Sequence, residues 1–290
     1  MEDLPPGAID ITAQRAQDRR HRDDGAMTPM PSLPDPLAAF RLDGRTALVT
    51  GARREIGRAI ALALAAQGAR VAIHHAGGED EARDAEEVRT RIVAGGGEAQ
   101  VFAADFAADG AAEELGAAAL RAFGGIDILV MNASIEILED WQTIPRAHFD
   151  RQIQVNLWAT LALLQALAPG MLARGWGRIV TIGSIQQQQP HPRMLVYAGT
   201  KAAQHNWAVN LARQFGGRGV TVNNLSPGVI ATARNRVQLA ADGGALLARV
   251  PVGRTGTPQD LVGAALLLCS DAGAYIHGAD ILVDGGRAVS

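Results

Sequence analysis

The stretch TALVTGARREIGRAIALALAAQGARVAIHH, residues 46–75, contains two short apolar runs separated by a helical one. The first apolar run ends in Gly51, the helical run over 58–68 ends in Gly68, and the second apolar run ends in two histidines. Short apolar runs bounded by glycine are typical of strands buried on both faces, and an intervening helix can connect two parallel strands. These 30 residues therefore predict a βαβ unit.

The same alternation continues to the C-terminus. Further strands are predicted at 99–106, 126–134, 177–184, 220–228 and 280–286, and helices at 79–97, 111–125, 146–172, 196–216 and 258–270. Alternating strands and helices imply right-handed crossovers and a parallel sheet covered on both faces. We therefore predict an α/β fold: a single doubly wound Rossmann domain with a parallel seven-stranded sheet and helices on both faces.

Residues 1–40 differ in composition from the rest of the chain. The segment RAQDRRHRDDGAMTPMPSLPDP, residues 15–36, is charged, rich in proline and without apolar periodicity. Such a segment cannot bury enough apolar surface to order itself. We predict a flexible N-terminal tail over 1–40 and a single Rossmann-fold domain over 41–290; a tail that binds a partner is the alternative.

The overall composition excludes several classes of function. The net charge of −3 gives no reason to expect a nucleic acid or an anionic membrane as partner. No apolar run is long enough to predict a membrane span, and the N-terminus lacks the apolar segment of a signal peptide. The single cysteine, Cys269, cannot form an internal disulfide, which suits a reducing compartment. We expect a cytoplasmic protein.

The turn after the first strand has the features of a dinucleotide site. Gly51 and Gly57 punctuate a strand–turn–helix, where glycine lets the backbone approach a pyrophosphate and the helix N-terminus favours its charge. An enzyme that uses NAD would place an acid at the end of the second strand, but no acid appears there before Glu79. Arg53 and Arg54 suit the 2′-phosphate of NADP, so NADP is favoured over NAD; two solvated surface arginines are the alternative.

Among 27 basic residues, Lys201 is the only lysine. On a helix, Tyr197 and Lys201 lie on the same face because they are four residues apart. A tyrosine hydroxyl titrates near about 10, and a neighbouring ammonium would favour the phenolate and permit proton exchange nearer neutrality. Lysine supplies a compact charge, whereas arginine carries a planar, delocalised one. This pair predicts a general acid/base.

Two further polar residues fit the same chemistry. Ser184 ends the strand that precedes the Tyr197 helix, where its hydroxyl could hold a substrate carbonyl. Asn156 interrupts the apolar run IQVNLWA, residues 153–159. A buried asparagine could satisfy local backbone groups, or it could anchor a water chain that replaces the exchanged proton.

Together, Asn156, Ser184, Tyr197 and Lys201 resemble the catalytic tetrad of the short-chain dehydrogenases/reductases. The resemblance covers about residues 42–287 and is closest to the β-ketoacyl reductases. It implies that Tyr197 exchanges a proton with the substrate, that Lys201 also binds the nicotinamide ribose, and that Ser184 polarises the carbonyl. Hydride would pass between NADP(H) and a carbonyl or secondary alcohol. The C-terminal block resembles the family's tetramer interface, which implies a homotetramer or homodimer.

The resemblance also implies a cofactor site spread over several strand ends. ILVMNAS, AADF and SPGVIATA resemble family motifs that follow the fourth, third and sixth strands. The predicted cofactor-binding residues are Gly51, Arg53, Arg54, Ile56, Gly57, His75, Asp105, Phe106, Asn132, Ala133, Tyr197, Lys201, Pro227, Gly228, Ile230 and Thr232. No metal is expected.

Two positions depart from the family pattern. Glu55 stands where the pattern TGxxxGxG has glycine, and Ser134 stands where NNAG has glycine. Glu55 either points outward or alters cofactor binding. Pteridine reductases also depart at both positions but carry an acid where this chain has Ser184. A pteridine reductase and a non-catalytic NADP-binding regulator are therefore the alternatives, and the intact tetrad argues against the regulator.

The segment between Ser184 and Tyr197, IQQQQPHPRMLV, is rich in donors and acceptors. Burying these groups against an apolar ligand would cost free energy. We therefore predict a polar small-molecule substrate in contact with Ser184, Gln186 and Tyr197. For Gln187 to Gln189 a solvated loop remains the alternative.

Overall fold

The computed structural model describes residues 35–290 except 234, 236–238, 240–243 and 245–246. The compact unit begins at Leu37, and a short 3-10 helix, η2 (Ala38–Phe40), precedes the first strand. Residues 1–34 of the predicted tail lie outside the described residues.

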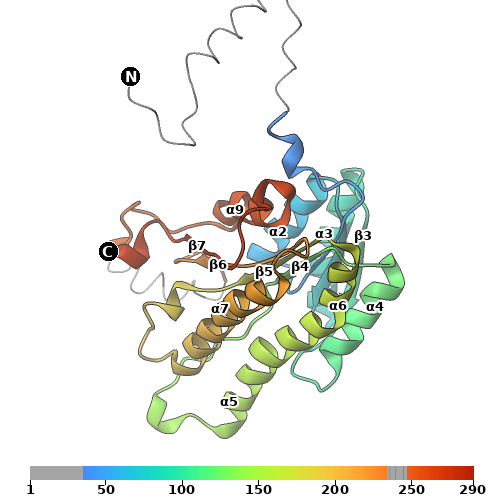
Figure 1. The fold of residues 1–290 in the computed structure, drawn as a ribbon. Helices are drawn as coiled ribbons and strands as arrows, with labels where there is room; N and C mark the ends of the chain where they lie inside the picture. The colour runs from blue at the N-terminus through green and yellow to red at the C-terminus, as the bar shows by residue number, and fades with distance from the viewer. Residues whose placement is uncertain (1–34, 234, 236–238, 240–243, 245–246) are drawn as a thin grey trace, which may run out of the picture. The chain divides into compact units, whose positions relative to one another are not determined.

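The body is built on a parallel sheet in the order β3-β2-β1-β4-β5-β6-β7 (Figure 1). This confirms the predicted doubly wound, seven-stranded sheet. The order reverses between β1 and β4, and in such a sheet ligands bind beyond the carboxyl ends of the strands near the reversal. The strands are β1 (Thr46–Val49), β2 (Arg70–His75), β3 (Ala99–Ala103), β4 (Ile128–Met131), β5 (Gly177–Ile182), β6 (Val220–Pro227) and β7 (Asp280–Val283).

Helices cover both faces of the sheet (Figure 1). Successive residues of a strand point to opposite faces: Val49 packs in the core under α2, α3 and α9, and Leu48 packs in the core under α4 and α6. This explains why the strands read as unbroken apolar runs. The helices are α2 (Glu55–Ala66), α3 (Glu79–Ala94), α4 (Ala111–Phe123), α5 (Arg146–Ile153), α6 (Ala159–Arg174), α7 (Leu195–Phe215) and α9 (Val262–Cys269).

The long helix predicted over 146–172 is interrupted. A π turn, η4 (Gln154–Trp158), separates α5 from α6 and contains Asn156. π turns leave backbone carbonyls without their usual helical partner and occur often at functional sites. Within the described ranges, 146–174 is also long and apolar enough to cross a membrane by composition, but 56% of its most apolar window is buried in the body.

Candidate active site

A cavity of about 950 Å³ lies at the carboxyl ends of the strands. Its walls come mainly from the segments that follow β1 to β6, with further residues from α5, α7 and the C-terminal turn after β7. All sixteen predicted cofactor-binding residues line it, as do Ser184 and Gln186. Asn156 does not line it. The structure therefore brings the predicted cofactor and substrate residues to one site, with Asn156 behind its wall.

Lys201 projects from α7 into a buried setting. Its side chain is 2% exposed, and its Nζ donates to the Ile182 carbonyl at 2.8 Å and to Gln204 Oε1 at 3.1 Å. The ammonium lies 5.6 Å from the centre of the Tyr197 ring. The predicted proximity of the two residues is thus present, and the charge is held where water screens it little.

Gln204 connects Lys201 to the π turn, a link that the sequence analysis missed. Its Nε2 donates to the Asn156 carbonyl at 2.8 Å and to Thr160 Oγ1 at 3.0 Å. The only local signal for this link is that Gln204 lies three residues after Lys201 on the same helix face.

The Asn156 side chain holds neighbouring backbone rather than facing the cavity. Its Oδ1 accepts from the Ile135 N–H and its Nδ2 donates to the Ile135 carbonyl, both at 2.9 Å. Nδ2 also donates to Thr200 Oγ1 at 3.1 Å. These contacts satisfy the backbone groups of Ile135 and join the loop after β4 to α7.

Ser184 begins the short 3-10 helix η5 (Ile185–Gln187), and its Oγ accepts from the Gln186 N–H at 3.2 Å. That contact leaves the hydroxyl hydrogen available to a substrate oxygen. Ser184 and Tyr197 are both largely buried and line the same cavity.

The glutamine run divides into two kinds of residue. Gln187 and Gln188 donate to the Asp280 carboxylate on β7 and do not line the cavity, and Gln188 is exposed. Gln186 and Gln189 line the cavity. Gln186 Oε1 accepts from the His191 N–H at 2.6 Å, which curves the loop back towards the site.

His74, which the sequence analysis did not assign, supports the glycine turn. The Gly51 N–H donates to His74 Nδ1 at 3.0 Å, and Nε2 lies 2.8 Å from the Ala104 carbonyl. Burial lowers the pKa of His74 to about 4, so the ring is neutral at pH 7 and can accept at Nδ1. The ring also stacks on Phe106, with centroids 4.4 Å apart.

Asn132 holds the other side of this turn. Its Nδ2 donates to the carbonyls of Thr50 and Gly51 at 2.9 and 3.1 Å. A Cβ at Gly57 would lie 2.6 Å from the same nitrogen and 2.3 Å from the Gly51 carbonyl oxygen. Glycine is therefore required at 57 by close packing between the turn and the end of β4.

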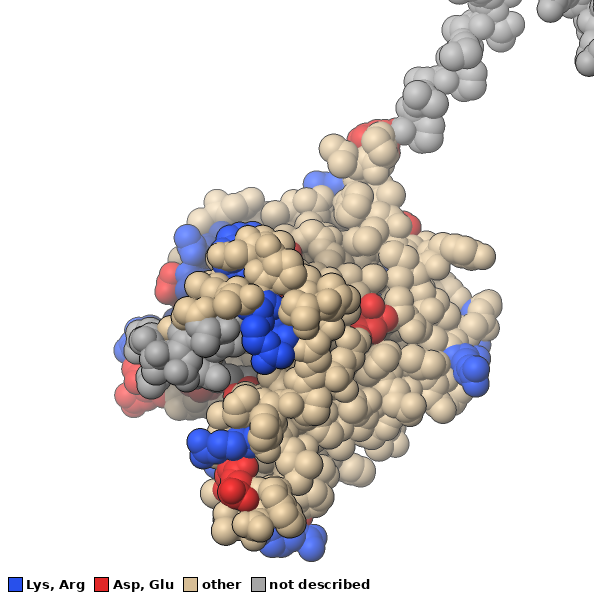
Figure 2. Space-filling view, turned by 90° about the vertical axis from the view of Figure 1, so that its left-hand side faces the viewer, with Lys and Arg blue, Asp and Glu red and all other residues tan. Residues whose placement is uncertain are grey.

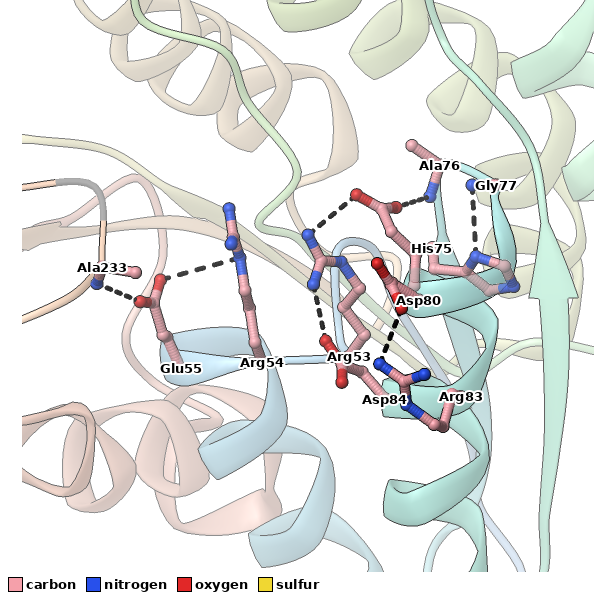
Figure 3. A network of polar contacts seen from close by, with 11 residues as sticks. Arg53, Arg54, Glu55, His75, Ala76, Gly77, Asp80, Arg83, Asp84 and Ala233 are labelled. Carbon is pink, nitrogen blue, oxygen red and sulfur yellow. Dashed lines mark hydrogen bonds and ion pairs between the residues drawn. The ribbon is translucent and has the colours of Figure 1, made fainter.

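The two arginines of the turn have different environments (Figure 3). Arg53 donates to Glu81 and Asp84 of α3, both at 2.8 Å. Its guanidinium is thus paired with two acids, although Arg53 also lines the cavity. Glu81 also accepts from the Ala76 N–H at 3.0 Å, so an acid reaches back to the end of β2. Arg54 is 49% exposed and remains the candidate.

Glu55 lines the cavity and lies between Arg54 and Ala233 (Figure 3). Its backbone φ is 52°, and among the described residues it is the non-glycine residue with positive φ. Its carboxylate accepts from the Ala233 N–H and lies 4.0 Å from Arg54 Nε. Glu55 therefore does not point outward; it ties the glycine turn to the segment after β6. The left-handed conformation costs a side chain about 1–2 kcal/mol.

Comparisons with known proteins agree with this geometry. A family model described as Enoyl-(Acyl carrier protein) reductase matches residues 51–288. The chain is a short-chain dehydrogenase/reductase. An L-rhamnose 1-dehydrogenase (NAD(P)(+)) of Azotobacter vinelandii is 37% identical over 85% of this chain and 97% of its own length.

Solved structures of the family superpose closely. A 3-oxoacyl (acyl-carrier-protein) reductase from Agrobacterium tumefaciens with NADP bound is 40% identical, with a TM-score of 0.80 over 89% of this chain and 98% of that one. A gluconate 5-dehydrogenase from Burkholderia cenocepacia in complex with NADP and tartrate is 32% identical, with a TM-score of 0.82 over 88% and 100%. The fold and the oxidoreductase class predicted from the sequence are confirmed.

Lys201→Arg should lower kcat of this dehydrogenase/reductase by at least about a hundredfold, a typical contribution of a positioned proton-transfer group. The planar guanidinium cannot occupy the buried site between Ile182 and Gln204 as an ammonium does. Tyr197→Phe should be at least as damaging. Steady-state kinetics measure both variants, and circular dichroism checks the fold. Arg213→Lys, an exposed exchange on the same helix, is the control; near parental turnover in Lys201→Arg would refute the role assigned to the lysine.

Glu55→Gly should tighten the binding of NADPH, used here as a probe, by about fivefold or more. Two like charges near 4 Å repel by about 1 kcal/mol even in water, and glycine also removes the side chain from the turn. Glu55→Gln removes only the charge and should give part of the gain. Fluorescence titration yields the Kd, with Glu113→Gln on α4 as the control. Unchanged affinity in both Glu55 variants would show that the carboxylate does not oppose the dinucleotide.

Proposed function

We propose that this chain transfers a hydride between NADP(H) and a secondary alcohol or carbonyl of a small, polar, polyhydroxylated molecule. One observation carries the proposal: the cavity that contains Ser184, Tyr197 and Lys201 is walled beside them by Gln186, Gln189 and His191. Gln186 Nε2 and His191 Nε2 can exchange hydrogen bonds with hydroxyl groups, whereas an apolar ligand would bury them unpaired. Gln189 is already held by Arg287 and Ala288.

The glycine turn suits a dinucleotide phosphate. Helix α2 begins at Glu55 with no side-chain cap on its N-terminus, and uncapped N–H groups favour an anion. Arg54 beside this turn favours NADP over NAD, and Glu81 is the feature that opposes this preference. When bound, the nicotinamide supplies the hydride acceptor in oxidation and the donor in reduction.

The residues of the chain then handle the proton and the orientation. In oxidation, the Tyr197 phenolate oxygen would take the proton of the substrate hydroxyl; in reduction, the Tyr197 O–H would return a proton to the carbonyl oxygen. Ser184 Oγ–H donates to the substrate oxygen and orients it. The Lys201 ammonium stabilises negative charge on the phenolic oxygen, and its burial strengthens that effect.

The proposal predicts a preference among substrates. With NADPH, NADP⁺, NADH and NAD⁺ in parallel assays, sugars and polyols should give higher kcat/KM than a steroid, a β-ketoacyl thioester or a pterin, and the NADP pair should exceed the NAD pair. Gln186→Leu should reduce this polar-over-apolar ratio by about tenfold, the effect of one lost hydrogen bond. Gln214→Leu on the exposed side of α7 is the control.

Three results of this screen would contradict the proposal. Preference for the steroid or the thioester would exclude a polar substrate, and an unchanged ratio in Gln186→Leu would remove this residue from the substrate site. Preferred turnover of the pterin would favour the pteridine reductase alternative.

We also propose that the protein is a homotetramer or homodimer in the cytoplasm. Strand β7 is an edge strand of the sheet, and Val252, Leu282 and Val289 near this edge are exposed. Figure 2 shows this side of the body, where most of the surface carries neither basic nor acidic side chains. Light scattering after gel filtration should give two or four times the 30.4 kDa of one chain; a monomer at micromolar concentration would overturn this proposal.

A further inference from the structure

The C-terminal 3-10 helix η8 (Arg287–Val289) contributes an arginine to the wall of the active-site cavity. Arg287 is 8% exposed. Its Nη1 donates to Gln189 Oε1, while its buried Nε has no hydrogen-bond partner in the part of the chain that the structure describes. A buried, unpaired donor on a charged group is costly, and this one borders the cavity that contains Ser184 and Tyr197.

The charge of Arg287 is also uncompensated by a neighbouring ion pair. No carboxylate of the described residues forms an ion pair with it. The adjacent Asp284 instead accepts from the N–H groups of Gly286 and Ala288 at 2.9 and 2.7 Å. Arg249 lines the same cavity. Burial lowers the pKa of the Arg287 guanidinium, the charge of Arg249 lowers it further, and Asp284 opposes both. An anion between two nearby cations, one of which is buried, would offset the repulsion between their positive charges.

The other charged side chains that line the cavity do not cancel the positive charge of Arg249 and Arg287. Arg151 of α5 also lines it, and Glu136 is the acidic side chain that lines it on the loop after β4. The other acids of the wall lie around the glycine turn and the ends of β2 and β3: they are Glu55, Glu81 and Asp105. On this side of the cavity, three arginines therefore face one acid: Arg151, Arg249 and Arg287 against Glu136.

We propose that Arg287, together with Arg249, binds an acidic group of the substrate, so that the preferred substrate is a polyhydroxylated carboxylic acid rather than a neutral sugar or alditol. This inference rests on the proposed function. A guanidinium can donate to two oxygens of a carboxylate. Nη1 of Arg287 is held by Gln189, and its buried Nε donates to no described residue. A phosphate presents similar oxygens, so the test includes it.

Anchoring the C-terminus does not require the guanidinium. Gln189 Nε2 donates to the Ala288 carbonyl at 2.7 Å, and the Asp284 carboxylate caps the same turn through backbone N–H groups. The Ser290 hydroxyl donates to the Arg249 carbonyl at 2.7 Å. Because these contacts hold the turn, substitutions of Arg287 can test binding without removing the anchor.

The experiment compares matched acidic and neutral substrates with NADP⁺: D-gluconate with D-glucitol, L-threonate with L-threitol, and glycerol 3-phosphate with glycerol. In the parent, the acid of at least one pair should have a kcat/KM at least about tenfold higher. Arg287→Leu should lower the value for that acid by about 10- to 150-fold, the range for a hydrogen bond to a charged group, and should change the neutral partner by less than about threefold. Arg249→Leu should cause a smaller loss.

Two further variants keep the test decisive. Arg287→Gln removes the charge but retains a polar side chain for Gln189, and it replaces Arg287→Leu if the latter has a lowered Tm. Arg83→Leu, on the exposed outer side of α3, controls for loss of an arginine. Tartrate, an anionic probe, should inhibit the parent competitively and Arg287→Gln at least about tenfold less.

The outcomes separate this inference from the function on which it rests. Equal turnover of acids and neutral polyols, or equal losses for both in the Arg287 variants, would overturn the anion site and leave the polyol function intact. Preference for the phosphate with the same Arg287 dependence supports the anion site and assigns its ligand as a phosphate. Turnover of steroid, thioester or pterin with no polyol or acid oxidised refutes the proposed function itself.

Discussion

The burial of one ammonium group constrains the catalytic half of this molecule. Removing an isolated cation from water costs several kcal/mol, so its hydrogen bonds must be satisfied inside the protein. Lys201 obtains them from the last residue of β5 and from Gln204. Gln204 in turn binds the Asn156 carbonyl in the π turn. One charge therefore fixes β5, α7 and the α5–α6 helix relative to one another, and Tyr197 is positioned as a consequence.

The cofactor half depends on neutral groups. Thr50, His74 and Asn132 hold the glycine turn through hydrogen bonds that involve no ionised side chain. The charged residues of this region do not take part in those hydrogen bonds. Arg53 is paired with acids of α3, and Glu55 accepts from the segment after β6. A change in these charges can alter affinity for the dinucleotide without dismantling the turn.

The substrate side is joined to the C-terminus by the glutamine run. Gln187 and Gln188 contact Asp280 of β7, and Gln189 contacts the backbone of Ala288. The Asp280 carboxylate also accepts from Asn224 and Ser226 of β6. The loop that carries Ser184 is therefore supported by residues about a hundred positions later in the chain, and substrate recognition depends on the last strand and the turn that follows it.

The sequence by itself determined the strands, the helices apart from the π turn within the one predicted over 146–172, the glycine turn and the Tyr197–Lys201 pair. Hydrophobic periodicity and helical spacing are local properties, so they can be recognised without coordinates. Only the tertiary structure decided that Arg53 is occupied by Glu81 and Asp84 and that His74 supports Gly51. The same is true of the link from Gln204 to Asn156 and of Arg287 in the cavity wall. Each of these depends on side chains from elements that are distant in sequence, and their contacts follow from how the helices and strand ends pack.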